Sequence, residues 1–278
     1  MDSKRSLRIA ILDLYEGAAN QGMRCIREIL HQYSDAYHLD IAVDEFDVRL
    51  KNEVPGTDYD VYISSGGPGS PLDTEGSEWE ARYFSWLNNM SAYNENPSNK
   101  TKKHIFLICH SFQLVCREWQ MAKVSKRKST AFGVFPVHLL EGGHHEAVFG
   151  GLPDPFYVVD SRDFQVTQPN LESIHAKGGH ILAIEKARLH VPLERAVMAM
   201  RFNGWMVGTQ FHPEADALGM SLHLQTPEKK ATVIENHGQE KWESMIEHLN
   251  DPDKIMFTYA RVLPNFLHYA LGKKELSY

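Results

Sequence analysis

Short apolar runs alternate with amphipathic stretches through the first half of the chain. The apolar runs predict strands at residues 7–14, 39–48, 59–63 and 104–109. The stretches between and after them carry apolar residues at helical spacing, and they predict helices at about 20–33, 78–90 and 110–122. Strands that alternate with helices are typical of a parallel sheet with helices on both faces. The pattern therefore predicts an α/β fold, flavodoxin-like, with a mostly parallel sheet.

The pattern changes after Thr130. Apolar runs separated by turn-rich joins predict an added, mostly antiparallel sheet region, with strands at 132–140, 157–166, 180–185, 196–201 and 205–211. From about Gly219 the chain reads as helical. Thr226-Pro227 and Asp251-Pro252 are helix-start signals, and Pro264 predicts a kink in the last helix. We expect a main domain at 1–218 and a C-terminal helical extension at 219–278 packed on it.

Composition narrows the class of protein. A chain of 278 residues with 42% hydrophobic content suits one large domain, alone or with a helical extension. The net charge of −7 makes nucleic acid an unexpected partner, and the basic run at 123–128 is interpreted as a helix end followed by a solvated loop. Three cysteines argue against a disulfide framework and favour a reducing compartment.

No targeting or membrane segment is evident in the sequence. The first six residues lack the apolar stretch of a signal peptide, and no apolar run is long enough to span a membrane. We therefore expect a cytoplasmic protein without membrane contact. Adjacent histidines at 144 and 145 lie in a glycine-containing loop without a second ligand cluster, so neither a metal nor a cofactor is expected.

Cys109 ends an apolar strand and is followed at once by a predicted helix. Such a turn exposes the side chain at its apex, and the free N–H groups of the helix start favour thiolate over thiol. Ser111 is small enough for a sharp turn, whereas Leu107 is not. Cys109 is thus a candidate nucleophile, with a packed core thiol as the alternative. Cys25 and Cys116 are better explained as packed thiols.

Gly66-Gly67-Pro68-Gly69 follows the predicted strand at 59–63. Successive glycines allow backbone N–H groups to converge on one point, which suits a developing oxyanion. An ordinary surface turn is the alternative. A phosphate-binding loop is excluded because no Gly-Lys-Ser/Thr follows.

Gln210-Phe211-His212-Pro213-Glu214 closes another predicted strand. His212 is a candidate base, and Glu214 is placed to accept a hydrogen bond from its imidazole. A loop with one of the chain's 15 histidines is the alternative. The three segments together predict a Cys–His–Glu triad of Cys109, His212 and Glu214.

The same three segments, in this order, resemble the class I glutamine amidotransferases over about residues 7–218, most closely stand-alone chains related to the glutaminase half of GMP synthase. The resemblance implies that Cys109 attacks the glutamine amide, that His212 is the base and that Glu214 orients it. It further implies an oxyanion hole from the N–H groups of Gly67 and His110, and a substrate pocket shaped by Gly66 and Gln113.

Two departures from the family pattern stand out. Leu107 and Ser111 occupy positions where the family has the glycines of its nucleophile turn. Arg162 stands where the family often has a histidine near the substrate. An arginine there is suited to bind a carboxylate, and thereby a γ-glutamyl donor other than glutamine; a surface arginine on a hairpin is the alternative.

The expected function is hydrolysis of glutamine to glutamate and ammonia through a thioester on Cys109, with ammonia supplied to a separate synthetase chain. Two alternatives remain open: a γ-glutamyl peptide hydrolase with the same triad, and a catalytically inactive binding protein on this scaffold. For the C-terminal extension, packing on the core is the default. A lid and a homodimer interface are further options.

Overall fold

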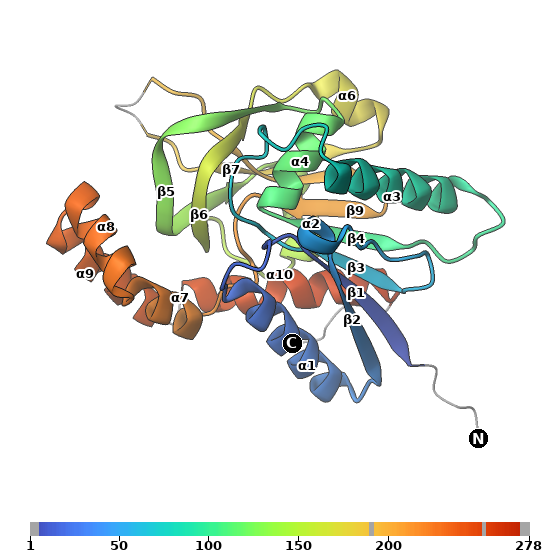
Figure 1. Cartoon of the computed structure of the whole chain (residues 1–278), viewed down its shortest axis with the longest axis horizontal. Helices are drawn as coiled ribbons and strands as arrows, with labels where there is room; N and C mark the ends of the chain where they lie inside the picture. The colour runs from blue at the N-terminus through green and yellow to red at the C-terminus, as the bar shows by residue number, and fades with distance from the viewer. Residues whose placement is uncertain (1–5, 189–191, 252–253, 273–278) are drawn as a thin grey trace.

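The computed structural model describes residues 6–188, 192–251 and 254–272. Within these ranges one nine-stranded sheet runs in the order β2-β1-β3-β4-β9-β8-β7-β5-β6 (Figure 1). Its strands are β1 (Leu7–Asp13), β2 (Ile41–Asp47), β3 (Val61–Ser64), β4 (His104–Ile108), β5 (Lys123–Leu139), β6 (Phe156–Thr167), β7 (His180–Glu185), β8 (Val197–Asn203) and β9 (Met206–Thr209). The helices are α1 (Gly22–Tyr37), α2 (Val48–Lys51), α3 (Glu78–Glu95), α4 (His110–Glu118), α5 (Glu141–His144), the 3-10 turn η1 (Ala147–Phe149), α6 (Leu171–Ala176), α7 (Ala217–Leu224), α8 (Pro227–His237), α9 (Gln239–Asn250) and α10 (Ile255–Ala270).

The sheet has a parallel half and an antiparallel half. β2, β1, β3, β4 and β9 are parallel, and β8, β7, β5 and β6 continue the sheet with antiparallel pairing. β9 belongs to both halves, because it is parallel to β4 and antiparallel to β8. The predicted α/β fold with an added antiparallel region is confirmed. This topology brings residues about a hundred positions apart to neighbouring strand ends, where open α/β sheets bind ligands.

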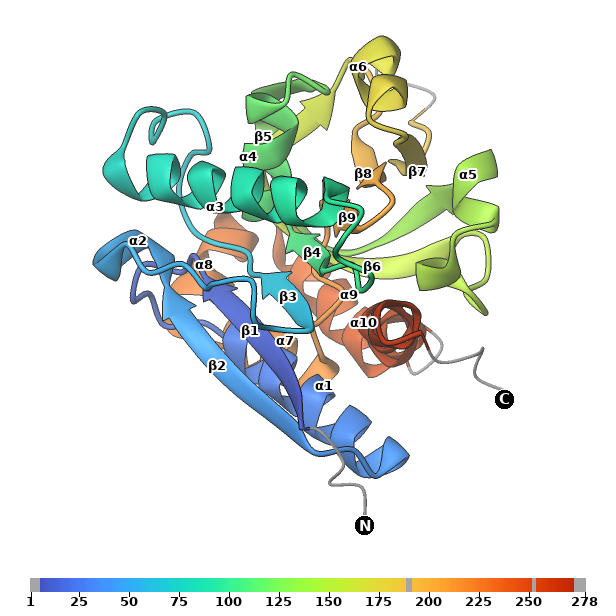
Figure 2. The ribbon, with the colours of Figure 1, turned by 90° about the vertical axis from the view of Figure 1, so that its right-hand side faces the viewer.

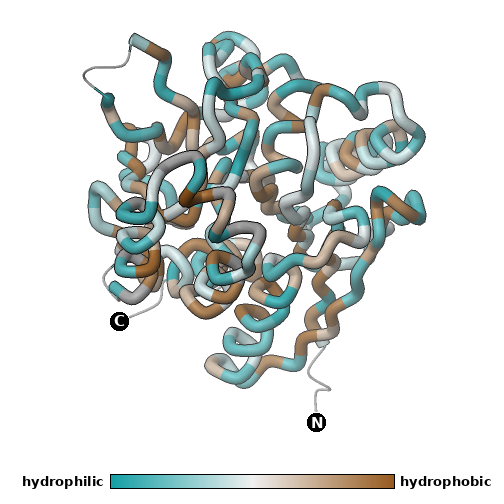
Figure 3. Tube along the Cα trace, turned by 60° about the vertical axis from the view of Figure 1, so that its left-hand side comes forward, coloured by the Kyte–Doolittle hydropathy of each residue, from teal (hydrophilic) through white to brown (hydrophobic). Residues whose placement is uncertain are grey.

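Helices cover both faces of the sheet. α1 and α10 pack on one face, and α2, α3 and α4 lie on the other (Figure 2). α10 contributes to the main core, since Phe266 meets Phe106 of β4 edge-on with ring centroids 5.1 Å apart. Hydrophilic and hydrophobic residues alternate along the helices at the surface (Figure 3). None of the helices in the described ranges combines the length and apolar composition that a membrane crossing needs.

Helices α7, α8 and α9 form an arm beside the β5–β6 hairpin (Figure 1). A third hydrophobic cluster joins this arm to the hairpin, with Phe132 and Val134 of β5 against Leu224, Val233 and Met245. α8 begins at Pro227 after Thr226, as the sequence signal predicts. Pro252 lies outside the described residues, and Pro264 lies inside α10. The predicted division of the chain at residue 218 stays a prediction.

The interpretation of the basic run at 123–128 is wrong. These residues form the start of β5 and pair with β6, from Lys123 opposite Thr167 to Lys126 opposite Phe164. Helix α4 ends at Glu118, four residues earlier than the predicted end, and Gln120 adopts a left-handed conformation with φ 51°. A left-handed residue at this point is a common helix stop. Arg127 is turned inward, where it pairs with Glu185 at 3.2 Å.

Candidate active site

The turn between β4 and α4 is strained at Cys109. This residue has φ 46° and ψ −93°, a conformation that non-glycine residues rarely adopt and that is stabilised only by its surroundings. The Cys109 N–H donates to the carbonyl of Thr209 on β9 at 2.8 Å, and its own carbonyl accepts from the Gln113 N–H at 3.0 Å. A strand-to-helix turn of this kind places the side chain at the apex of a sharp turn, as in nucleophile elbows.

Ser111 ties the turn to the neighbouring strand. Its hydroxyl accepts a hydrogen bond from the Ile108 N–H at 2.9 Å and lies 2.9 Å from the carbonyl of Ser64, to which it donates. Ser111 is completely buried. A serine at this family glycine position therefore adds a bond between the ends of β3 and β4.

Leu107 finds its space beside a glycine of the next strand. Leu107 pairs with Gly208 of β9 in the sheet register. A Cβ atom at position 208 would lie 2.9 Å from the Leu107 Cβ and 3.0 Å from the Phe112 ring. Leu107 itself is fully buried in the core beneath the turn. The missing side chain on β9 thus makes room for the extra side chain on β4.

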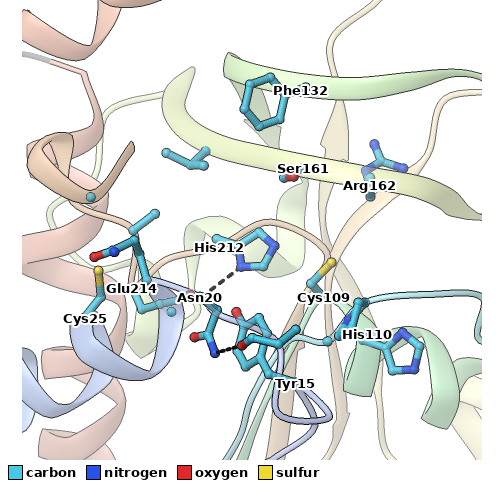
Figure 4. Close-up of a pocket in the computed structure, with 18 of the residues that line it drawn as sticks. Tyr15, Asn20, Cys25, Cys109, His110, Phe132, Ser161, Arg162, His212 and Glu214 are labelled. Atoms are coloured by element: carbon cyan, nitrogen blue, oxygen red, sulfur yellow. Dashed lines mark hydrogen bonds and ion pairs between the residues drawn. The ribbon is translucent and has the colours of Figure 1, made fainter. Parts of the chain in front are cut away.

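His212 and Glu214 meet Cys109 at the same pocket (Figure 4). The His212 Nδ1 lies 2.8 Å from Glu214 Oε1, and the His212 N–H is anchored to the Val159 carbonyl of β6 at 2.9 Å. Glu214 is buried, and its Oε2 has no hydrogen-bond partner. The ring and the sulfur of Cys109 face each other across the pocket in Figure 4. The sequence-predicted trio is therefore brought to one place.

The charges around His212 favour its protonated form. Burial alone lowers the pKa of the imidazole, but the negative charges of Glu214 and Cys109 outweigh it and raise the His212 pKa well above 6.5.

Replacing Glu214 by glutamine is expected to lower the pKa of His212, because it removes the negative charge that does most to raise that pKa. A His212 pKa that is higher in the folded than in the unfolded chain stabilises the fold. This stabilisation is complete below the unfolded pKa, near 6.5, and is lost as the pH rises through the folded pKa. The variant should therefore lose stability at acidic pH relative to alkaline pH. NMR titration of the histidine ring protons measures the shift. His110 is the internal reference, since burial and the charges of Arg49 and Arg117 lower its pKa to about 3 and it should not titrate between pH 5 and 8. An unchanged His212 titration in the variant would contradict this account.

Two glycines allow the loop after β3 to lie close to His212 and to Leu14. A Cβ at Gly66 would lie 2.9 Å from His212 Cε1 and 3.2 Å from the Tyr15 hydroxyl. At Gly67 a Cβ would lie 2.4 Å from the Leu14 carbonyl oxygen, which excludes any larger residue without backbone movement. Gly67 and His110, the two predicted oxyanion donors, both line the pocket that holds Cys109.

Gln113 reaches Cys109 through a second glutamine. The Gln113 side-chain amide donates to Gln210 Oε1 at 3.2 Å and to the Phe164 carbonyl at 3.3 Å. The Gln210 amide in turn donates to the Cys109 sulfur at 3.7 Å. Gln210 opens the motif that carries His212, but the sequence pattern alone does not indicate a role for it.

Arg162 is not a surface residue. Its side chain is 1% exposed, and its Nε donates to both carboxylate oxygens of Asp160 at 2.8 and 3.0 Å. Its Nη1 donates to the Phe164 carbonyl at 3.2 Å, and its Nη2 lies 3.7 Å from Glu185. Pairing with Asp160 satisfies the buried charge. Figure 4 draws the guanidinium pointing away from Cys109, so its role in substrate binding stays a prediction.

The pocket extends well beyond the cysteine. Its volume is about 410 Å³, and it runs past His212 to the start of α1 and to α7, where Asp216, Gly219 and Met220 line it. Tyr15, at the carboxyl end of β1, also lines it; the rule that ligands bind at such strand ends is the signal that points to this residue. Within the described ranges, no group of three or more His, Cys, Asp or Glu side chains is placed to hold a metal.

Comparisons with known proteins bear on the family and the fold of the chain. The family model for glutamine amidotransferase class-I matches residues 23–224. A glutamine amidotransferase from Thermotoga maritima superposes with a TM-score of 0.63 at 14% identity, covering 96% of this chain and 99% of that one. A glutamine amidotransferase from Methylobacillus flagellatus gives 0.58 at 11% identity, covering 99% and 98% of the two chains. The glutaminase domain of Trypanosoma brucei CTPS with bound acivicin gives 0.57 at 14% identity, covering 98% and 96%.

No curated protein matches the chain in sequence. The structural likenesses show the fold, a mixed α/β sheet with helices on both faces. The family match spans most of the chain, which therefore belongs to the class I glutamine amidotransferases. The closer resemblance to GMP synthase relatives stays a prediction.

Proposed function

We propose that this chain hydrolyses the side-chain amide of glutamine to glutamate and ammonia, with Cys109 as nucleophile. The observation that carries the proposal is the meeting of a strained Cys109 with a His212–Glu214 pair at one pocket. Strained backbone at a cysteine on a helix start is costly, and such strain concentrates at functional sites.

The proposed reaction has two stages, formation and hydrolysis of a thioester. The Cys109 sulfur adds to the amide carbon, and the carbonyl oxygen becomes an oxyanion that the N–H groups of Gly67 and His110 bind. Protonated His212 gives its proton to the amide nitrogen, which leaves as ammonia and leaves a γ-glutamyl thioester. Water then adds to the thioester while His212 takes a proton from it. Collapse expels the Cys109 sulfur as a thiolate and releases glutamate, whose carboxyl proton passes to solvent. His212 is protonated again, which restores the starting state.

The other groups support these steps. Glu214 holds the His212 ring and stabilises the imidazolium, as its 2.8 Å contact allows. Gln210 and Gln113 hold the sulfur and one wall of the pocket. We further propose that the ammonia passes to a separate acceptor enzyme.

The purified chain is expected to release glutamate and ammonia in equal amounts from glutamine, and His212→Asn is expected to lower kcat by about 10³-fold or more, since it removes the proton donor and base. A coupled glutamate assay measures turnover, and mass spectrometry after rapid acid quench detects the γ-glutamyl adduct on Cys109. Turnover that persists in His212→Asn would contradict the assigned role.

A γ-glutamyl peptide hydrolase is the second candidate, because the cavity of about 410 Å³ continues past His212 to the start of α1 and to α7, which leaves room for a donor larger than glutamine. Assays with γ-glutamyl peptides beside glutamine decide between them by the ratio of kcat/KM values. A larger kcat/KM for the peptides than for glutamine would show that γ-glutamyl peptides are the preferred donors.

A further inference from the structure

Two arginines bind backbone carbonyl groups of the loop that follows β3. Arg49 of α2 donates from Nη1 to the Pro68 carbonyl at 2.7 Å. Arg117, in the last turn of α4, donates to the Pro71 carbonyl. The first contact comes from the β1–β2 side of the sheet, and the second comes from the helix that carries the cysteine. The segment Gly66–Pro71, here called the oxyanion loop, is thus held at two points.

The side chains of both arginines are little exposed, and each pairs with a glutamate. The Arg49 side chain is 6% exposed, pairs with Glu16 at 2.6 Å, and lies over the Trp79 ring at 5.3 Å. The Arg117 side chain is 12% exposed and pairs with Glu80, which is itself 2% exposed. A planar guanidinium fixed by a carboxylate presents its remaining N–H groups in one direction, which makes it a rigid hydrogen-bond donor.

Arg49 acts on the part of the loop that carries a predicted oxyanion donor. Its Nη1 also lies 3.4 Å from the Leu14 carbonyl, the group against which Gly67 packs so closely that a Cβ would come within 2.4 Å. Arg49 therefore fixes the backbone on which Gly67 rests and also the carbonyl of the next residue. Only the two dihedrals of Gly67 and the ψ of Pro68 separate the Gly67 N–H from the Pro68 carbonyl, since the proline ring fixes its own φ and the peptide bond is planar. Contacts on both sides of Gly67 therefore restrict the direction of its N–H.

His110, the second predicted oxyanion donor, lies near Arg49 and Arg117. The ring of His110 is buried, and its Nε2 has no hydrogen-bond partner. The positive charges of Arg49 and Arg117 both contribute to lowering the pKa of this ring. Neither arginine lines the pocket, so neither contacts a substrate held there.

We propose that Arg49 and Arg117 are positioning residues for the oxyanion hole. They hold the oxyanion loop so that the N–H groups of Gly67 and His110 converge on one point beside Cys109. The inference rests on the proposed function, since a role in turnover requires that the chain hydrolyse an amide. Holding the loop is a separate property, which can be measured without turnover.

The kinetic test compares Arg49→Met and Arg117→Met with Arg82→Met. Arg82 also pairs with a glutamate, Glu78 at 2.9 Å, but it is 56% exposed on α3 and serves as the matched control. Arg49→Met is expected to lower kcat for glutamine by about 10- to 100-fold, less than the full loss of an oxyanion donor, with KM nearly unchanged. Arg49→Lys should restore part of kcat, because its ammonium still reaches a carbonyl.

Alkylation of Cys109 by iodoacetamide separates positioning from general damage, because that reaction builds no oxyanion. Its rate should stay at the wild-type value in both variants. An unchanged kcat in Arg49→Met and Arg117→Met would overturn the proposal. So would a fall in kcat accompanied by equal losses in alkylation rate and melting temperature, since that pattern marks a purely structural role.

Hydrogen exchange of the oxyanion loop amides tests the holding directly. Exchange at residues 64–72 should be faster in Arg49→Met and Arg117→Met than in wild type, and unchanged in Arg82→Met. Unchanged exchange in the first two would overturn the proposal whether or not the enzyme turns over. If the wild-type chain releases no ammonia from any donor, the proposed function fails, and faster exchange would still establish that the arginines hold the loop.

Discussion

Replacing Cys109 by alanine is expected to abolish ammonia release from glutamine, with a loss in kcat of about 10⁵-fold or more, as for other enzymes that lose their nucleophile. The thioester cannot form without the sulfur, and water is a far weaker nucleophile. The fold should survive, because Cys109 is held by backbone bonds to Thr209 and Gln113 that alanine retains. Alanine keeps the same strained φ, so no new backbone cost arises.

Cys116→Ala is the matched control. Cys116 lies on the same helix and is completely buried, and burial raises the pKa of its thiol well above the ordinary value, which makes it unreactive. Its replacement should cost about 1 kcal/mol of stability, typical of a single substitution, and leave kcat intact. Equal loss of activity in both variants, or activity retained in Cys109→Ala, would refute the assignment of Cys109. Mass spectrometry after iodoacetamide treatment should show the label on Cys109 and not on Cys116.

Gly208→Ala is expected to lower both the activity and the stability of the chain, although Gly208 does not line the pocket. The added methyl would meet the Leu107 Cβ at 2.9 Å and the Phe112 ring at 3.0 Å. Overpacking of this kind typically costs about 1–3 kcal/mol. The strain falls between β4 and β9, whose ends carry the nucleophile and the base, and displacement of reacting groups by about 1 Å can cost about 100-fold in rate. We expect kcat to fall by about 10- to 100-fold, together with a lower melting temperature.

Gly204→Ala is the control for this prediction. Gly204 lies in the turn between β8 and β9, and a Cβ there would meet nothing within 4 Å. It should leave kcat and stability near the wild-type values. A double-mutant cycle identifies the cause: Gly208→Ala should cost less stability in a Leu107→Gly background than in wild type, because the closest contact has been removed. Equal costs in the two backgrounds would show that Leu107 is not what Gly208 accommodates.

The accommodation of Leu107 also bears on the binding-protein alternative. That alternative rested on the bulky residue at a position where the family has glycine. The structure shows the volume compensated across the strand pair, with the turn at Cys109 sharp and bonded at both ends. Leu107 therefore no longer favours an inactive scaffold.

Local patterns predicted most of the elements. Apolar runs located the strands β1, β3 and β4, and helical spacing located α1, α3 and α4, because burial of one face leaves a period in the sequence. The start of β5 was missed because its charged residues at 123–128 carry no apolar period. The strand is held there by backbone pairing with β6, and pairing to a distant partner leaves no mark in a local window.

Some residues of the candidate site were predicted from the sequence, and others were not. Cys109, His212 and Glu214 were predicted because their motifs carry chemistry in short segments. Gly66 and Gly67 were predicted because successive glycines allow backbone N–H groups to converge on one point. Tyr15, Gln210 and Arg49 could not be assigned roles, since each acts through residues distant in the chain. For Arg162 the sequence left two readings open, and the buried pairing with Asp160 removed the surface one.

The sequence by itself determined the α/β class, the family, and the side chains available for chemistry, since these depend on local periodicity and on short motifs. Only the tertiary structure decided which of them meet. β9 lies next to β4, so His212 reaches the end of the strand that leads into Cys109. The same pairing sets Gly208 opposite Leu107, and the packing of α2 brings Arg49 to the oxyanion loop. Such contacts depend on the order of strands in the sheet, which is fixed by the packing of the whole chain.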